Sequence, residues 1–309
     1  MRADMYRVTM LCKYWLMPRD SIYQPKQHRV EREFDIRGAK YCVYEWGNRQ
    51  APLLVYLHGW ADTGSTFQFV VDALREDWHV VAPDWRGFGR STCECTSYWF
   101  PDYLADLHAL LDIFSPEDPI RLVGHSMGGN VGSLYAGTMP ERVRAFINVE
   151  GFGLPDSDPA DAPGRYRAWI EAGSAAPRFS EYANLEALAY RIRKRHPSMS
   201  GAEALFVAGE WASQDSDGVA RLRADPRHKL PSPILYRRAE ALACCSAVTA
   251  AVLFVTGSNS EFAQKYGHAP TPLFSDSKSV AIDGAGHMPH FEAPRALAGE
   301  IEDFLLPTL

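Results

Sequence analysis

The sequence predicts an α/β fold in which helices flank a mostly parallel central sheet. Strand-like and helix-like segments alternate along most of the 309 residues, and the strand-like segments are short apolar runs. Such runs are typical of strands that are buried on both faces. Residues 153–232 differ in composition and interrupt the alternation. We therefore expect a core formed by residues 28–152 and 233–309, preceded by an N-terminal extension (1–27) and carrying a helical cap insertion (153–232).

The expected elements of the core follow from local patterns. Residues 29–36 and 41–46 flank an Arg37-Gly38 turn and predict an antiparallel hairpin. Buried strands are expected at the apolar runs 53–57, 79–82, 120–123, 143–149, 251–256 and 279–282. Apolar residues at helical spacing predict a helix over 101–114, and a final helix is expected over 294–305. A helix of small residues is expected to end at Pro140.

The insertion begins with a segment that is rich in turn-forming residues. Residues 153–164 hold three prolines, three aspartates and two glycines, so a loop leaves the sheet there. The pattern from 165 to 232 is mostly helical and includes several aromatic side chains. We expect this segment to lie above the carboxyl ends of the strands, where open α/β sheets bind their ligands.

Composition excludes several classes of partner. The formal net charge is −6 without a long basic run, so no nucleic-acid partner is expected. No apolar stretch approaches the roughly 20 residues of a membrane span, so we expect no stable membrane insertion. The six cysteines lack metal-binding spacing and are expected to be reduced thiols of a cytoplasmic protein. Histidines and carboxylates also lack such spacing, so neither a metal nor a cofactor is expected. The oligomeric state is left open.

The strongest chemical motif is Gly124-His125-Ser126-Met127-Gly128-Gly129. It follows an expected strand and precedes an expected helix, so Ser126 should lie on a sharp strand-to-helix turn with its hydroxyl exposed. The flanking glycines let the backbone segments crowd together at that turn. We predict that Ser126 is a nucleophile.

A second motif, Gly286-His287-Met288-Pro289, follows the strand expected at 279–282. His287 comes after Ser126 in the chain and is the expected general base, which takes the serine proton and returns it to the leaving group. A third motif, His58-Gly59-Trp60, follows the strand expected at 53–57. The backbone N–H groups of Trp60 and Met127 are the expected oxyanion-hole donors.

These three motifs, together with Asp84–Ser91, resemble the α/β-hydrolase superfamily. They are most similar to its branch of small bacterial esterases, C–C bond hydrolases and serine-hydrolase-like proteins. The resemblance covers the two core segments and carries little of the insertion. It implies the α/β-hydrolase fold, a catalytic triad and hydrolytic chemistry, but no particular substrate.

The acid of the triad departs from the family pattern. Most of the superfamily has an aspartate three residues after the glycine that ends the strand at 251–256, and Ser260 occupies that position here. Two substitutes remain open. Glu150 directly follows the buried strand 143–149 and is preferred because its backbone should be well held. Glu261 lies in a polar loop and is the alternative.

Ester hydrolysis is the leading expectation, because a serine with an oxyanion site suits acyl transfer to water. A small ester-like molecule is therefore the expected substrate, bound by Trp60, Phe152, Trp169 and Trp211 under the insertion. Hydrolysis of a lactone, thioester, amide or C–C bond, and peracid formation, use similar parts. A ligand-binding protein of this fold without turnover is the alternative of a different class.

Overall fold

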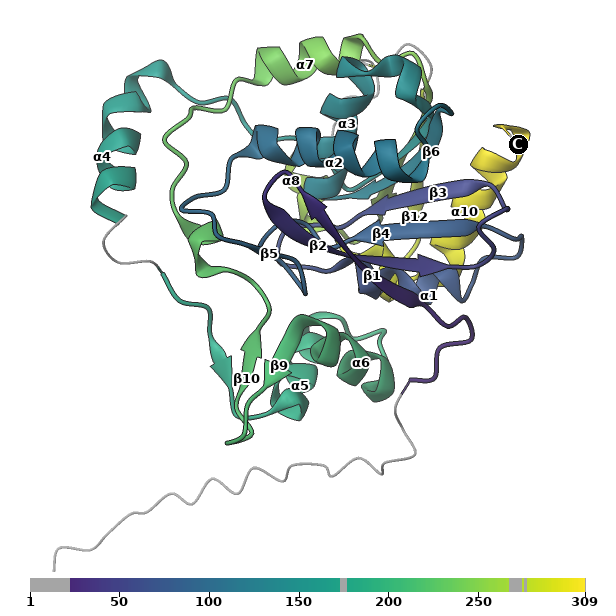
Figure 1. Ribbon diagram of the computed structural model, residues 1–309, viewed down its shortest axis with the longest axis horizontal. Coiled ribbons are helices and arrows are strands. Elements are labelled where there is room, and N and C mark those ends of the chain that lie inside the picture. The colour runs from purple at the N-terminus through teal and green to yellow at the C-terminus, as the bar shows by residue number, and fades with distance from the viewer. Residues whose placement is uncertain (1–22, 173–176, 267–273, 275–276, 309) are drawn as a thin grey trace, which may run out of the picture.

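A nine-stranded sheet forms the centre of the protein in the computed structural model, which describes residues 23–172, 177–266, 274 and 277–308 (Figure 1). Its strands are β1 (Val30–Ile36), β2 (Ala39–Trp46), β3 (Leu53–Leu57), β4 (His79–Pro83), β5 (Thr92–Cys93), β6 (Ile120–His125), β7 (Val143–Val149), β11 (Ala251–Gly257) and β12 (Ser277–Ile282). The strand order is β1-β2-β4-β3-β6-β7-β11-β12, and β5 pairs with β2.

The direction of the strands confirms the predicted sheet. β1 and β2 form the expected antiparallel hairpin, in which Arg37 and Gly38 both have positive φ, and β2 is also antiparallel to β4. Every later neighbour along the sheet, from β4 to β12, is parallel. The carboxyl ends of β3, β6, β7 and β11 therefore meet at one edge.

Helices cover both faces of this sheet. The first face carries α2 (Phe100–Phe114), α3 (Met127–Thr138) and α7 (Arg238–Ser246), and the second carries α1 (Gln68–Val71) and α10 (Pro294–Leu305). β3 shows why the sheet is apolar throughout: Val55 and Leu57 pack into the first core, whereas Leu54 and Tyr56 pack into the second. The shorter helices are η2 (Gly64–Phe67), η3 (Pro140–Arg142), α8 (Glu261–Tyr266), α9 (Pro289–Glu292) and η7 (Leu306–Thr308).

The insertion combines helices with a small sheet. Its elements are η4 (Pro159–Asp161), α4 (Ala162–Ala172), β8 (Glu181–Tyr182), α5 (Leu185–Arg195), α6 (Gly201–Trp211), β9 (Ala212–Gln214), β10 (Ala220–Leu222) and η5 (Pro226–Lys229). The three strands form an antiparallel sheet that the helical prediction for 153–232 did not include. Strands of two or three residues are too short to produce a visible alternation. In Figure 1, α4 lies apart from α5 and α6.

The α5–α6 pair packs on the core through a third apolar cluster. Leu188 and Ile192 of α5 and Val207 of α6 are buried there together with Phe69 and Phe291 of the core. α6 begins with a capping box between Ser200 and Glu203, which satisfies N–H groups at its start. This part of the insertion is thus anchored beside the segment that follows β12.

The expected N-terminal extension lies mostly outside the described residues, which begin at Tyr23. The residues that are described dock on the end of α1: the Tyr23 hydroxyl donates to the Asp72 carboxylate at 2.5 Å, and the Gln27 N–H donates to it at 2.8 Å. No helix in the described ranges is both long and apolar enough to cross a membrane.

One expectation about the cysteines is wrong. Cys93 and Cys95 form a disulfide, whereas Cys42, Cys244 and Cys245 are free thiols. The Cα atoms of the bonded pair lie 5.1 Å apart, which is within the range that a disulfide spans. Spacing in the sequence did not reveal the bond, because one intervening residue matches none of the usual motifs.

Candidate active site

Ser126 lies on the turn between β6 and α3. Its φ is +50°, a conformation that non-glycine residues rarely adopt, and its N–H is held by the carbonyl of Val149 at 2.8 Å. The flanking glycines are required by close approach. A Cβ on Gly124 would lie 2.4 Å from the carbonyl oxygen of Gly128, and one on Gly128 would lie 2.1 Å from that of Leu57. The sequence motif thus produces the strained turn that the chemistry of an exposed nucleophile needs.

His287 lies between Ser126 and Glu150. Its Nε2 is 3.1 Å from the Ser126 Oγ, and its Nδ1 is 3.0 Å from the Glu150 Oε2. Because a carboxylate only accepts, Nδ1 carries the proton and Nε2 is left to accept from the serine hydroxyl. The Glu150 side chain is fully buried, whereas that of His287 is partly exposed. The structure thereby brings the predicted nucleophile, base and preferred acid into one hydrogen-bonded chain.

Glu150 is held by the ends of two neighbouring strands. It directly follows β7 with φ +58°, and its N–H donates to the Val255 carbonyl at 2.9 Å. Its carboxylate accepts from the Gly257 N–H at 2.7 Å and from the Ser260 hydroxyl at 2.5 Å. Sequence reasoning treated Ser260 only as a missing acid. A hydroxyl at the usual acid position was the signal that could have identified Ser260 as a hydrogen-bond partner of Glu150.

The alternative acid, Glu261, lies elsewhere. It is exposed at the start of α8, and none of its contacts with described residues involves His287. The next residue, Phe262, does reach the imidazole: its ring stacks on that of His287 with centroids 4.2 Å apart and planes 23° apart. Sequence analysis did not single out Phe262, because an exposed aromatic in a short helix carries no motif.

The loop after β3 lies against Ser126, as the oxyanion prediction requires. A Cβ on Gly59 would lie 3.3 Å from the Ser126 Cβ. Within the described residues, no hydrogen bond uses the N–H of Trp60 or Met127. His58 holds this loop from behind: its Nε2 accepts from the Trp85 N–H at 2.8 Å, and burial lowers its pKa to about 4. His58 is thus a neutral, buried brace, and the two N–H groups are free to bind an oxygen.

The four residues expected to bind substrate do not form one cluster. Trp60 is about half exposed and packs near Phe88 and Phe179. Phe152 is buried against Phe254 in the core. Of the exposed aromatic side chains, Phe262 contacts His287, and Trp60 lies on the loop whose Gly59 approaches Ser126.

The two tryptophans of the insertion, Trp169 and Trp211, also lie in different places. Trp169 on α4 packs against Trp99, which precedes α2, and α4 lies apart from α6 in Figure 1. Trp211 ends α6, and its indole N–H donates to the Asp62 carboxylate at 2.7 Å. The shared role that the sequence suggested for these residues therefore stays a prediction, and for Trp169 the geometry offers no support.

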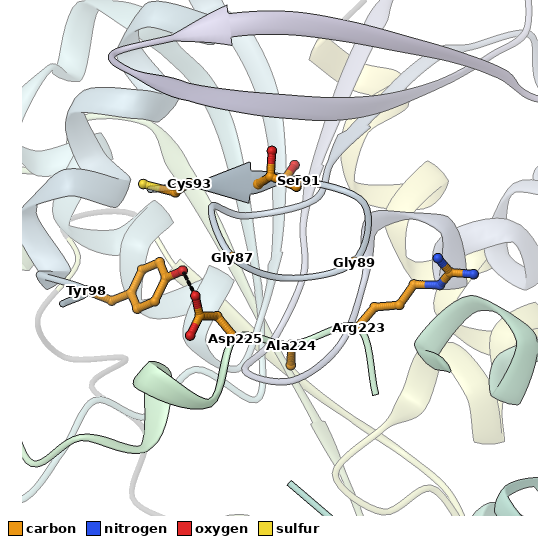
Figure 2. A pocket seen from close by; sticks show the side chains of 9 residues that line it. Gly87, Gly89, Ser91, Cys93, Tyr98, Arg223, Ala224 and Asp225 are labelled. Atoms are coloured by element: carbon orange, nitrogen blue, oxygen red, sulfur yellow. Dashed lines mark hydrogen bonds between the residues drawn. The ribbon is translucent and has the colours of Figure 1, made fainter. Parts of the chain in front are cut away.

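A hollow of about 290 Å³ lies where the insertion returns to the core (Figure 2). Figure 2 shows Tyr98 pointing at Asp225, to which its hydroxyl donates at 2.9 Å, and Arg223 pointing away from the hollow. Backbone hydrogen bonds from Gly89 to Arg223 and from Asp225 to Gly87 join the two segments. None of Ser126, Glu150 and His287 lines this hollow. It is a feature of the junction between the insertion and the core, distinct from the predicted substrate pocket.

One buried group of side chains has the chemistry of metal ligands. Asp62, His125 and His290 each offer an atom within 4.8 Å of the others, so among the described residues these could hold a metal ion. Sequence spacing did not suggest the group, because it comes from three distant segments. Two of its nitrogens are already engaged: His290 Nε2 donates to Asp62 at 3.1 Å, and His125 Nε2 donates to the His287 carbonyl at 2.8 Å. The expected absence of a metal stays a prediction.

Comparisons with known proteins identify the family of the fold. The sequence model of the family described as the alpha/beta hydrolase fold matches residues 52–294. A serine hydrolase-like protein of Danio rerio is 27% identical over 275 residues, which cover 85% of this chain and 84% of that protein. A 2-(acetamidomethylene)succinate hydrolase of Mesorhizobium japonicum is 26% identical over 279 residues, which cover 90% and 96%.

A solved structure is also similar to this chain. The thioesterase domain from the curacin biosynthetic pathway superposes with a TM-score of 0.79 at 25% identity, covering 89% of this chain and 99% of that domain. The match to the family extends over strands β3 to β12, the insertion and the segment that carries His287. The chain belongs to the α/β-hydrolase fold family.

Proposed function

We propose that the protein is a serine hydrolase that cleaves a carboxylic ester through an acyl-enzyme on Ser126. The observation that carries this proposal is the chain of hydrogen bonds from Ser126 through His287 to Glu150, at the end of two parallel strands. His287 acts as general base and Glu150 as the acid that fixes its tautomer. The N–H groups of Trp60 and Met127 form the oxyanion hole.

The first half-reaction forms the acyl-enzyme. The Ser126 Oγ attacks the ester carbonyl carbon while its proton passes to His287 Nε2. The carbonyl oxygen becomes an oxyanion that accepts from the two free N–H groups, and Glu150 stabilises the imidazolium. As the carbonyl re-forms, the bond to the alkoxy group breaks, and His287 returns the proton to the departing alcohol.

The second half-reaction releases the acid. A water molecule gives a proton to His287 Nε2 and attacks the acyl carbon, and the tetrahedral intermediate collapses with departure of the Ser126 oxygen. His287 then protonates that oxygen, so that the carboxylic acid leaves and the serine hydroxyl is restored. The substrate is a small molecule, and its apolar part contacts the exposed rings of Trp60 and Phe262.

Thioester or C–C bond hydrolysis is the second candidate. The similarity to a thioesterase domain and to a 2-(acetamidomethylene)succinate hydrolase favours keeping it. A serine acyl-enzyme serves a thioester as it serves an ester, since only the leaving group differs. A comparison of matched p-nitrophenyl esters and acyl thioesters of the same chain lengths, by kcat/KM, separates the two.

A fluorophosphonate probe tests the activated serine itself. We expect labelling of the wild type, loss of labelling in S126A, and retention in S246A, in which the lost hydroxyl lies on the exposed end of α7. A p-nitrophenyl acyl series should then show turnover at one or more chain lengths. A wild-type protein that the probe does not label would contradict the proposal and favour a ligand-binding protein without turnover.

A further inference from the structure

The segment that carries His287 is tied to the insertion at two points. This segment, named here the His287 loop, spans residues 284–292 between β12 and α10. Its first part is held by the core: the Gly284 N–H donates to the Ser258 hydroxyl at 2.9 Å, and the Ala285 carbonyl accepts from the Asn259 N–H at 2.9 Å. Its second part, after His287, makes side-chain contacts that lead to α5 and α6.

The first tie runs through Glu292. Its Oε2 accepts from the N–H of Gly286, the residue before His287, at 2.6 Å, and its Oε1 accepts from His196 Nδ1 at 2.7 Å. His196 directly follows α5, and both side chains are nearly buried. Burial raises the pKa of Glu292, but the contact with His196 and the backbone donors lower it by more. The net result is a pKa below the usual value of a glutamate. The carboxylate is therefore ionised and bridges the insertion to the backbone beside His287.

The second tie runs through Asp62. Its Oδ2 accepts from His290 Nε2 at 3.1 Å, and its Oδ1 accepts from the indole N–H of Trp211 at 2.7 Å. Asp62 and His290 are fully buried. Burial raises the pKa of Asp62, but its contacts with His290 lower it to about 2. Oδ1 also accepts from the Thr66 hydroxyl at 2.9 Å. A buried carboxylate holds its donors firmly, because losing one removes part of the compensation for its charge. This tie joins the end of α6 to the other side of His287.

We propose that the α5–α6 pair positions His287, with His196 acting through Glu292 and Trp211 acting through Asp62. This inference rests on the proposed function. These four are positioning residues, since none of them contacts Ser126 or the His287 imidazole. The two ties bracket His287 at Gly286 and His290. Together with His125, whose Nε2 donates to the His287 carbonyl at 2.8 Å, they fix the backbone from which the His287 ring projects. Catalysis is sensitive to such placement: a displacement of about 1 Å can cost about 100-fold in rate.

The proposal makes the insertion part of the machinery that places the base. An insertion that only covers the substrate pocket would change KM, and the change in KM would grow with the length of the acyl chain. An insertion that positions His287 changes kcat for every substrate. This includes p-nitrophenyl acetate, whose acyl group is too small to contact the insertion. The two roles therefore separate in a kcat-against-KM comparison across chain lengths.

The experiment uses His196 because it allows a conservative rescue. His196→Ala removes the donor to Glu292, whereas His196→Asn keeps an N–H at the same distance from the backbone as Nδ1. We expect His196→Ala to lower kcat about 10-fold on p-nitrophenyl acetate with KM changed by less than about 2-fold. His196→Asn should recover most of that loss. Trp211→Phe removes the other donor and should also lower kcat.

Ser200→Ala is the matched control. It removes the capping box of α6 and loosens the same helix pair, but it touches neither tie. We expect its kcat to stay within about 2-fold of wild type, although its thermal midpoint falls. The rate of fluorophosphonate labelling should follow kcat in all variants, since labelling needs the same base.

The outcomes separate this inference from the function on which it rests. Equal kcat in His196→Ala and wild type, loss confined to KM, or equal loss in His196→Ala, His196→Asn and Ser200→Ala would each overturn the positioning role. In those cases, wild-type labelling that depends on Ser126 would still support the proposal that the protein is a serine hydrolase. A wild type without labelling overturns the hydrolase itself.

Discussion

Ser260 donates a hydrogen bond to the Glu150 carboxylate at 2.5 Å. β7 and β11 are parallel neighbours, with Val149 in register with Val255, so their carboxyl ends lie side by side. Either strand end can therefore present an acid to the same imidazole nitrogen. In this protein the carboxylate that contacts His287 follows β7, and the position after β11 supplies a hydroxyl donor to that carboxylate.

Glu150→Gln is expected to lower kcat by at least about 100-fold, because an amide can hold the imidazole in the wrong tautomer and cannot stabilise its cation. Glu261→Gln serves as the control and should leave kcat within about 2-fold, because Glu261 is exposed at the start of α8. Steady-state hydrolysis of a p-nitrophenyl ester measures both. Full turnover in Glu150→Gln would disprove the assignment.

A swap tests whether the two strand ends are interchangeable. Ser260→Asp alone places two carboxylates in contact, so one of them must bind a proton and activity should fall. The double variant Glu150→Ser with Ser260→Asp returns the acid to the position after β11. We expect the kcat of the double variant to exceed that of Glu150→Ser alone and that of Ser260→Asp alone. If the double variant is the least active of the three, the backbone at Glu150, with its positive φ, does more than carry a carboxylate.

The sequence predicted the sheet well because most of its strands are short apolar runs, which are typical of strands buried in a parallel sheet. Ser126, His287 and Glu150 could be singled out because each follows a strand or lies in a motif, and the structure brings these three predicted residues into contact. Features that depend on very short strands or on distant residues were missed. The sheet β8-β10-β9 has strands too short to show a period, and the ties through Glu292 and Asp62 join residues far apart in the chain. Only tertiary packing brings such partners together.

The contribution of His58 to the free energy of unfolding should fall as the pH drops from about 6.5 to about 4. Burial lowers the pKa of His58 to about 4 from its usual value of 6.5, and burial also lowers the pKa of His125 and His228. Over that range the unfolded chain binds a proton at His58 that the folded chain does not, so acidification favours unfolding. For His58 alone the loss amounts to about 3 kcal/mol.

Urea unfolding of wild type and His58→Gln at pH 7 and pH 4.5 measures this contribution. Glutamine cannot take up the proton, so the variant should lose less stability between the two pH values, whatever its stability at pH 7. An identical difference for both proteins would show that His58 does not titrate in this way.

Phe262 should stabilise the protonated form of His287. Its ring stacks on the imidazole at 4.2 Å, so it faces the positive charge that forms when His287 takes the serine proton. Such contacts contribute about 0.5–2 kcal/mol, which corresponds to about 2- to 30-fold in rate. We expect Phe262→Leu to lower kcat within that range, because the cation loses its aromatic partner. Phe262→Tyr keeps the ring and should retain kcat. Steady-state hydrolysis of a p-nitrophenyl ester measures both, and a Phe262→Leu variant as active as the wild type would show that the ring does not stabilise the cation.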